Sequence, residues 1–397
     1  MSEKSYKAVS EKSEKEALLE TPGEEKKAVE NPTNKEAFCN VWRNSRWIML
    51  NALLHPLYSM VNAIVIGQQD DEKMLAGLGL GSLTMGIMCL SIGTSFNGGV
   101  GTFISHAYGQ KEYRQCQVYR NKAIFIGTIL YCILAVPLIC IKPLYMAIGQ
   151  DEVMADYATT YVHWTLPFIY FYYLSQIYST YACQQEVTWY GIYAMLAGCG
   201  SHAIMILIFY SWLDLGYKGV IMATGVMFFF RFLVNYLMVV CRKDVRQFDD
   251  VYLFSRETTS NLIPLVRKSF ASTALGVWGW WSFDIFTLMS TYINPTAAGA
   301  QTIMRAIGLL TFMMPAGYSG GCGIMIGKSV GQQRTDLVFK YYRISQLSAV
   351  GISVFQIIVL AIFRDGFIAL FTEEPNVVAA IKSAWPILIM FTFVDAT

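Results

Sequence analysis

Long apolar runs follow one another along most of the chain, separated by short polar segments. A helix needs about 20 predominantly apolar residues to cross a bilayer. Nine runs meet this length, and a tenth begins near residue 377. The nine are 47–67, 74–105, 122–142, 155–182, 190–210, 219–241, 261–292, 296–327 and 344–363. The pattern therefore predicts an all-α, polytopic membrane protein with about ten spanning helices.

The basic residues are concentrated in alternate loops between these runs. Loops 110–121, 242–260 and 328–343 are rich in Lys and Arg, whereas the loops that alternate with them carry at most one basic residue each. Cytoplasmic loops of membrane proteins hold an excess of Lys and Arg. The alternation predicts that these three loops and the N-terminus lie in the cytoplasm. Loop 183–189, on the same predicted side, has no basic residue.

The chain repeats part of itself at a shift of 222 residues, from Gly101 to Gly323. The other recurring residues are Ile104, Gly109, Gln110 and Tyr119, which return as Ile326, Gly331, Gln332 and Tyr341. Six helices in each copy would face the same way, so the copies are expected to form two lobes related by a pseudo-two-fold axis along the membrane normal. A complete second copy would extend about 65 residues beyond Thr397. We therefore expect an incomplete second lobe, in a fragment, a splice form or a faulty gene model.

This repeat predicts four segments. Residues 1–41 begin with a stretch dense in Lys and Glu and almost free of large apolar side chains, so they are expected to be a disordered cytoplasmic tail. Residues 42–241 form the first lobe (the N-lobe, helices 1–6), and residues 242–260 form a cytoplasmic linker. Residues 261–397 form the partial second lobe (the C-lobe, helices 7–10).

Composition excludes several functional classes. The chain is 54% hydrophobic and only 15% charged, which is too little charge for a soluble surface of this size. A net charge of +2 argues against a nucleic-acid partner. The nine cysteines form no CxxC pair and no Cys/His ligand spacing, and no Walker loop, GxSxG or HExxH motif is present. We expect neither an enzyme nor a metal or cofactor site, apart from a coupling ion, H+ or Na+.

One stripe in run 261–292 carries both a carboxylate and an indole on a single helix face. Its members, spaced three or four residues apart, are Gly276, Trp280, Asp284, Thr287 and Thr291. A carboxylate inside a membrane is costly unless it meets water, a partner or a substrate, and an indole attracts cations. The stripe predicts a site that binds a cation or a proton at Asp284, with Trp280, its neighbour Trp281 and Thr287 beside the solute. The alternative is a structural ion pair of Asp284 with Arg305 or Arg231.

A second polar stripe lies in the first run, where Pro56 is expected to bend the helix. It consists of Asn51, His55, Tyr58 and Asn62. The repeat shift places Tyr58 opposite Trp280 and Asn62 opposite Asp284, so both stripes are predicted to line one substrate cavity. Hydrogen bonding between packed helices is the alternative for this stripe.

Two further ionisable residues lie within predicted spans. His202 is a candidate proton relay, with a buried and hydrogen-bonded histidine as the alternative. Asp395, in the tenth run, is a second candidate for ion coupling, by the same argument as Asp284.

From about Trp42 to its end, the chain resembles the multidrug and toxic compound extrusion (MATE) transporters of eukaryotes. Residues 280–284 (W-W-S-F-D) look like the helix-seven pattern E-W-W-[SA]-[YF]-E, and residues 314–319 are similar to the family's helix-eight P-x-G. Further similarities are the helix ends 107–109 and 330–332, the start of helix six at Gly216, Gly219 and Ala223, and His202, which matches a histidine of some plant members. Gly279 stands where the family has its first helix-seven acid, and Trp189 where it has a proline. Asp395 falls where animal members have an acid in helix ten.

The resemblance implies a twelve-helix, two-lobed antiporter that exchanges organic cations or other small solutes for protons or sodium. We expect alternating access between the lobes of a monomer in the lipid bilayer, in the plasma membrane or a vacuolar or vesicular membrane. Its partners would be lipid and a small-molecule substrate. Two alternatives remain open: a lipid or oligosaccharide flippase of related architecture, and a membrane subunit that does not transport.

Overall fold

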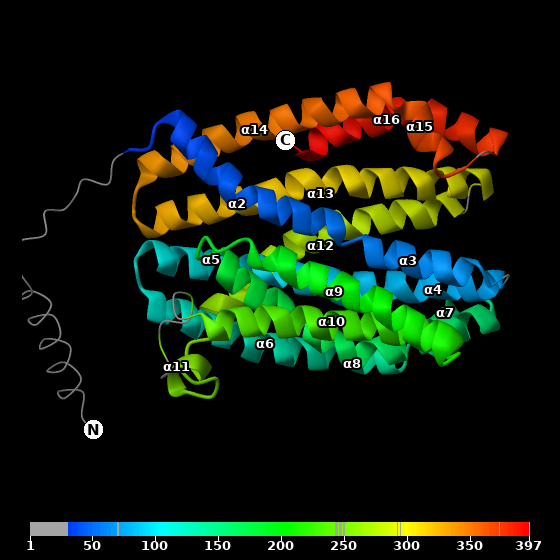
Figure 1. Cartoon of the computed structure of the whole chain (residues 1–397), viewed down its shortest axis with the longest axis horizontal. Helices are drawn as coiled ribbons and strands as arrows, with labels where there is room; N and C mark the ends of the chain where they lie inside the picture. Colours follow the sequence, from blue (N-terminus) through cyan, green and yellow to red (C-terminus); the bar gives the residue numbers. More distant parts are fainter. Residues whose placement is uncertain are drawn as a thin grey trace, which may run out of the picture.

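The computed structural model describes residues 31–69, 71–242, 245, 248, 251–291, 293, 295–372 and 374–396. Every regular element in these residues is a helix, and the long helices run roughly parallel to one another (Figure 1). The first half contains α2 (Asn34–Leu54), α3 (Leu57–Gly67), α4 (Glu72–Met85), the π-helical turn η1 (Gly86–Leu90), α5 (Ser91–Gly109), α6 (Tyr113–Ile139), α7 (Lys142–Ala147), α8 (Glu152–Cys183), α9 (Tyr190–Ile206), η2 (Leu207–Trp212) and α10 (Gly216–Cys241). The second half contains α11 (Arg256–Thr259), α12 (Ile263–Thr291), α13 (Pro295–Gly331), α14 (Thr335–Ile362), α15 (Arg364–Ala369) and α16 (Pro375–Ala396).

Each predicted apolar run corresponds to one long helix or to a helix with a local break. Eight helical stretches in the described residues are long and apolar enough to cross a membrane by length and composition. The two other predicted runs, 155–182 and 261–292, fold as α8 and α12, which have 32 and 29 residues. The prediction of an all-α polytopic membrane protein is confirmed.

The first helix begins earlier than its apolar run. Thr33 and Glu36 form a reciprocal capping box that starts α2 at Asn34. Ala37 and Val41 are fully buried in a cluster with Tyr341 of α14. Residues 34–41 belong to the segment expected to be disordered, but they are helical. The capping box and the packing against α14 stabilise these turns although they lie outside the apolar run. Residues 1–30 of that segment lie outside the described residues.

The first span is bent at Pro56, as predicted, and its two halves belong to different packing units. Proline has no N–H for the helix ladder, and α2 ends at Leu54 while α3 starts at Leu57. The first half, α2, packs mainly on α13 of the C-lobe, whereas α3 packs on α4, α9 and α10 of the N-lobe. The predicted N-lobe segment 42–241 therefore does not coincide with one packed unit, since α2 packs mainly on the C-lobe helix α13 (Figure 1).

The lobes meet where α5 runs along α12 and α13, a contact called here the interlobe seam. At the end of α5 nearest the basic loops, a Cβ on Gly109 would lie 3.0 Å from the Cα of Gly331. Further along, a Cβ on Gly99 would lie 2.7 Å from the backbone N of Ser269 on α12. Contacts this close need glycine, since no larger residue fits without moving a backbone. The lobes are thus tightly packed on the side that the charge pattern assigns to the cytoplasm.

Candidate functional site

Asp284 of α12 forms an ion pair inside the C-lobe. Its Oδ1 accepts a hydrogen bond from Nη2 of Arg305, which lies on the neighbouring helix α13. The side chain of Asp284 is 11% exposed and that of Arg305 is 37% exposed. A paired carboxylate is far less costly in a membrane than an isolated one. Arg305 is one of the two partners named in the ion-pair alternative. Because its side chain is partly exposed, the pair is not sealed inside the protein.

The two adjacent indoles of α12 point to different lobes. The ring of Trp280 meets Phe312 of α13 edge to face, with centroids 5.5 Å apart. The Nε1 of Trp281 donates to the backbone O of Ile87, 3.3 Å away in η1 of the N-lobe. Ile87 lies in a π-helical turn, a break in helix geometry that often marks functional positions. Trp281 therefore contacts the N-lobe across the interlobe seam, while Trp280 packs within its own lobe.

Asn62 and His202 form a buried network within the N-lobe. Asn62 Nδ2 donates to Thr224 Oγ1 of α10 over 2.9 Å, and Asn62 Oδ1 lies 3.0 Å from His202 Nε2 of α9. With the amide in this orientation, the imidazole donates and the amide oxygen accepts. The network joins α3, α9 and α10 through neutral groups. This geometry favours the packing alternative for Asn62 and the hydrogen-bonded alternative for His202.

The other members of the first stripe lie around Tyr58. Its buried ring makes edge contacts with the rings of His55 and His202, at centroid distances of 5.7 and 6.3 Å. His55 is half-buried at the end of α2, and Asn51 lies against Gly191 at the start of α9. The described contacts of this stripe are therefore with N-lobe helices.

The two stripes contact different helices. Tyr58 and Asn62 face α9 and α10, whereas Trp280 and Asp284 face α13. The described contacts of each stripe are with helices of its own lobe, and a cavity shared by the two stripes stays a prediction. The repeat placed the residues at equivalent positions, but the face that each helix presents depends on its neighbours. The side chains of Thr287 and Asp395, in α12 and α16, lie outside the described residues.

A buried arginine of α10 was absent from the predicted site. The side chain of Arg231 is buried in the N-lobe, and its Nη2 donates to Gln176 Oε1 of α8 over 3.3 Å. Its guanidinium carbon lies 5.9 Å from the centroid of the Tyr172 ring. The charge was visible in the sequence as an arginine within an apolar run, but its surroundings were not.

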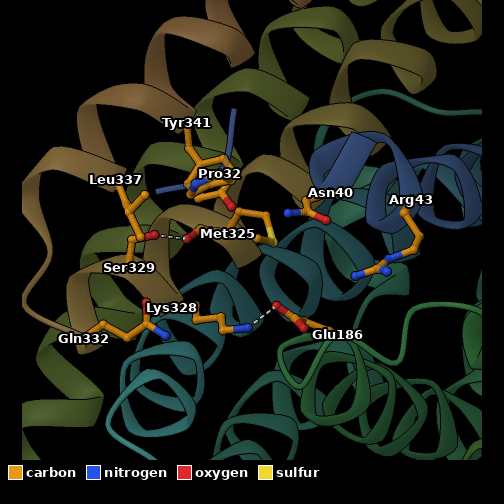
Figure 2. A pocket seen from close by; sticks show the side chains of 10 residues that line it. All are labelled: Pro32, Asn40, Arg43, Glu186, Met325, Lys328, Ser329, Gln332, Leu337 and Tyr341. Atoms are coloured by element: carbon orange, nitrogen blue, oxygen red, sulfur yellow. Dashed lines mark hydrogen bonds and ion pairs between the residues drawn. The ribbon is translucent and has the colours of Figure 1, made fainter. Parts of the chain in front are cut away.

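A polar pocket of about 220 Å³ lies where α2, α13 and α14 meet the loop after α8. Figure 2 shows Lys328 of α13 reaching to Glu186 of that loop, and the two atoms Nζ and Oε1 are 2.6 Å apart. Asn40, Arg43 and Tyr341 are among the other lining residues. This ion pair links the C-lobe to the N-lobe at the end that the charge pattern assigns to the cytoplasm, and the sequence analysis did not anticipate it.

Comparison with known proteins gives these features a family context. The chain is 22% identical over 381 residues to the uncharacterized transporter C323.07c of Schizosaccharomyces pombe, covering 95% of this chain and 71% of that protein. It is 21% identical over 346 residues to multidrug and toxin extrusion protein 1 of Danio rerio, covering 87% of this chain and 58% of that protein. The chain thus spans less than two thirds of the length of the zebrafish relative.

A solved structure and a family model agree with these relatives. The crystal structure of the eukaryotic MATE transporter AtDTX14 matches with a TM-score of 0.85 at 17% identity, covering 91% of this chain and 81% of that one. At this identity the match shows the fold, which is that of a two-lobed membrane transporter. The MatE family model matches residues 48–208 and 277–397, most of the chain. The chain belongs to the MatE family of membrane transporters.

Proposed function

We propose that this chain is a secondary active antiporter that exports organic cations or other small amphipathic solutes in exchange for H+ or Na+ by alternating access. Support comes from membership of a transporter family and from relatives named for multidrug and toxin extrusion. The observation that carries the proposal is the Asp284–Arg305 pair, an exchangeable charge held between two membrane helices.

The pair provides a means of coupling. A proton or Na+ arriving at Asp284 would neutralise the carboxylate and free Arg305, so the net charge beside the solute rises by one unit. That change lowers the affinity of the site for a cation, or changes its affinity for another polar solute. The solute then leaves on the outer side. Loss of the ion restores the pair. Coupling requires that ion and solute bind the two conformations with different affinities, and a pair that opens and closes supplies this difference.

The test is solute uptake into proteoliposomes that contain the purified chain. Tetraethylammonium is the probe, and a pH gradient or a Na+ gradient is imposed separately to identify the coupling ion. We expect gradient-driven transport by the wild type, its retention in Asp284→Glu, and its loss in Asp284→Asn. The control is Ser282→Ala, which removes a hydroxyl that donates to the backbone O of Gly279 in the same helix. Full gradient-driven transport by Asp284→Asn would contradict the proposed coupling.

The protein is a multi-pass integral membrane protein, and we propose that it acts as a monomer with its N-terminus in the cytoplasm. The basic loops 110–121 and 328–343 lie at the same end of the helices as the start of α2, which supports this orientation (Figure 1). Cys39, in the first turns of α2, is exposed and free. In a chain whose other cysteines are serine, an impermeant maleimide should therefore label Cys39 in permeabilised cells and not in intact ones. Labelling in intact cells would reverse the assignment.

A further inference from the structure

Arg231 carries a charge in the membrane interior of the N-lobe, and no described residue pairs with it as a counter-charge. It lies near the middle of the 26-residue helix α10 and is 4% exposed. Every acidic residue between positions 73 and 241 lies in a loop or within the first five residues of a helix. These residues are Glu112, Asp151, Glu152, Asp156, Glu186 and Asp214. A buried charge is costly unless it is paired, so Arg231 needs a partner that its own lobe does not supply.

The contacts that Arg231 does make leave most of its donors unused. The guanidinium has five N–H groups, and its one hydrogen bond to a described residue goes to the neutral amide of Gln176 at the long distance of 3.3 Å. Its Nε and Nη1 are buried and have no hydrogen-bond partner among the described residues. The Tyr172 ring, 5.9 Å away, is at the limit of a cation–π contact. A planar guanidinium with free N–H groups matches the geometry of a carboxylate.

A chain of hydrogen-bonded polar side chains leads from the guanidinium of Arg231 to the interlobe seam. Gln176 donates to Tyr172 Oη over 3.1 Å and to Thr94 Oγ1 over 3.4 Å, and both Gln176 and Thr94 are half-buried. Ser95, the next residue of α5, accepts a hydrogen bond from Ser272 of α12 across the seam at 2.9 Å. Gln176 therefore lies between the buried arginine and the surface along which the lobes must separate. Its long hydrogen bonds are weak, so the amide can be displaced.

We propose that Arg231 and Gln176 form a subsite for a carboxylate group of the transported solute. The carboxylate takes the place of the Gln176 amide oxygen and accepts from the guanidinium, while the Gln176 amide and the Thr94 hydroxyl donate to its second oxygen. This inference rests on the proposed function and narrows one part of it: the small amphipathic solutes that are exported besides simple cations include organic acids or zwitterions.

The experiment compares ligands that differ only in this group. Equilibrium dialysis of 2-naphthoate and of its neutral isostere 2-naphthamide is performed against the purified full chain in nanodiscs, without any gradient. We expect the wild type to bind the carboxylate at least about 10-fold more tightly than the amide, the range of a hydrogen bond to a charged group. Arg231→Met should abolish this preference. Equal affinity of the wild type for both ligands would overturn the subsite.

Two further variants distinguish loss of the subsite from misfolding and from a general loss of ligand affinity. Gln176→Glu places an internal carboxylate beside Arg231, so it should raise the melting temperature and still abolish the preference. Arg120→Met removes another buried arginine, which already bonds to Asn121 and stacks on Tyr181, and should keep the preference. A preference that survives Gln176→Glu would contradict the proposal.

A small inorganic anion is the other negatively charged group that could occupy the subsite beside Arg231. Binding is therefore repeated with chloride replaced by sulfate at constant ionic strength. The preference should be independent of chloride; a preference that chloride abolishes at millimolar concentration would make an inorganic ion the occupant and overturn the solute subsite. If this binding test contradicts the carboxylate subsite, the proposed antiport is unaffected, because tetraethylammonium transport is measured separately and under a gradient.

Discussion

At the scale of single residues, the Asp284–Arg305 pair is the main charge arrangement of the described C-lobe interior. The sequence predicted that Asp284 needs a partner, and it named Arg305 as one of two candidates, because intramembrane charges are few. It did not predict which way the neighbouring indoles point. Trp280 and Trp281 are adjacent, so they lie about 100° apart on α12, and only the packing of α13 and η1 decides which lobe each one meets.

A double-mutant cycle measures this pair. Arg305→Met leaves an unpaired carboxylate between α12 and α13 and should lower the melting temperature in detergent. A fully buried pair loses about 3–5 kcal/mol when one partner is removed, but Arg305 is partly exposed, so we expect about 1–2 kcal/mol. The double variant Asp284→Asn/Arg305→Met should recover most of this loss. Additive effects of the two substitutions would show that the residues are not coupled.

At the scale of helices, run length and loop charge predicted the spans well. The predicted run 296–327 folds as α13 (Pro295–Gly331), and 261–292 folds as α12 (Ile263–Thr291). These boundaries could be predicted because a bilayer demands a continuous apolar stretch of nearly fixed length. The early start of α2 could not be found in this way, since its first turns lie beyond the apolar run and are stabilised by the Thr33 cap and by packing on Tyr341. The capping-box pattern itself was present in the sequence.

The predicted site was recovered less completely than the helices, for a physical reason. Helical periodicity shows which residues share a face, but the environment of that face is set by other helices. Asn62 and His202 were both singled out, yet the sequence did not show that they bond to each other, nor that Thr224 completes their network. The partners of Arg231 were missed in the same way, because Gln176 and Tyr172 lie 55 and 59 positions earlier in the chain.

At the scale of the whole molecule, the first span is shared between the lobes. Since α2 packs on α13 and α3 packs on N-lobe helices, any rocking of the lobes has to change the angle between α2 and α3. Pro56 lies at this junction, where the helix ladder is already interrupted. The bend is therefore where the proposed alternating-access movement would hinge, and the lobes are packed together at the end that the charge pattern assigns to the cytoplasm.

The Lys328–Glu186 pair links the two lobes at this end. Glu186 belongs to the N-lobe and Lys328 to the C-lobe, and their side chains are only partly exposed (Figure 2). Glu186 has a φ of +65°, a left-handed conformation that is unfavourable for glutamate and persists only where the surroundings enforce it. The tight turn after α8 thus places this carboxylate at the lobe boundary. Any separation of the lobes at this end has to part this pair and also Gly109 from Gly331.

Charge reversal at this pair tests whether it sets the balance between conformations. The readout is the maleimide reaction rate of Ser105→Cys, at a seam residue buried against Gly327, in a chain whose exposed cysteines are serine. Glu186→Lys should raise the rate about 5- to 10-fold, because repulsion replaces an attraction worth about 1 kcal/mol. Glu186→Lys with Lys328→Glu should restore the slow rate. Asp156→Lys reverses a pair with Lys142 inside the N-lobe and should leave the rate unchanged. If that control raises the rate equally, or if the double reversal does not lower it, the pair does not hold the lobes closed.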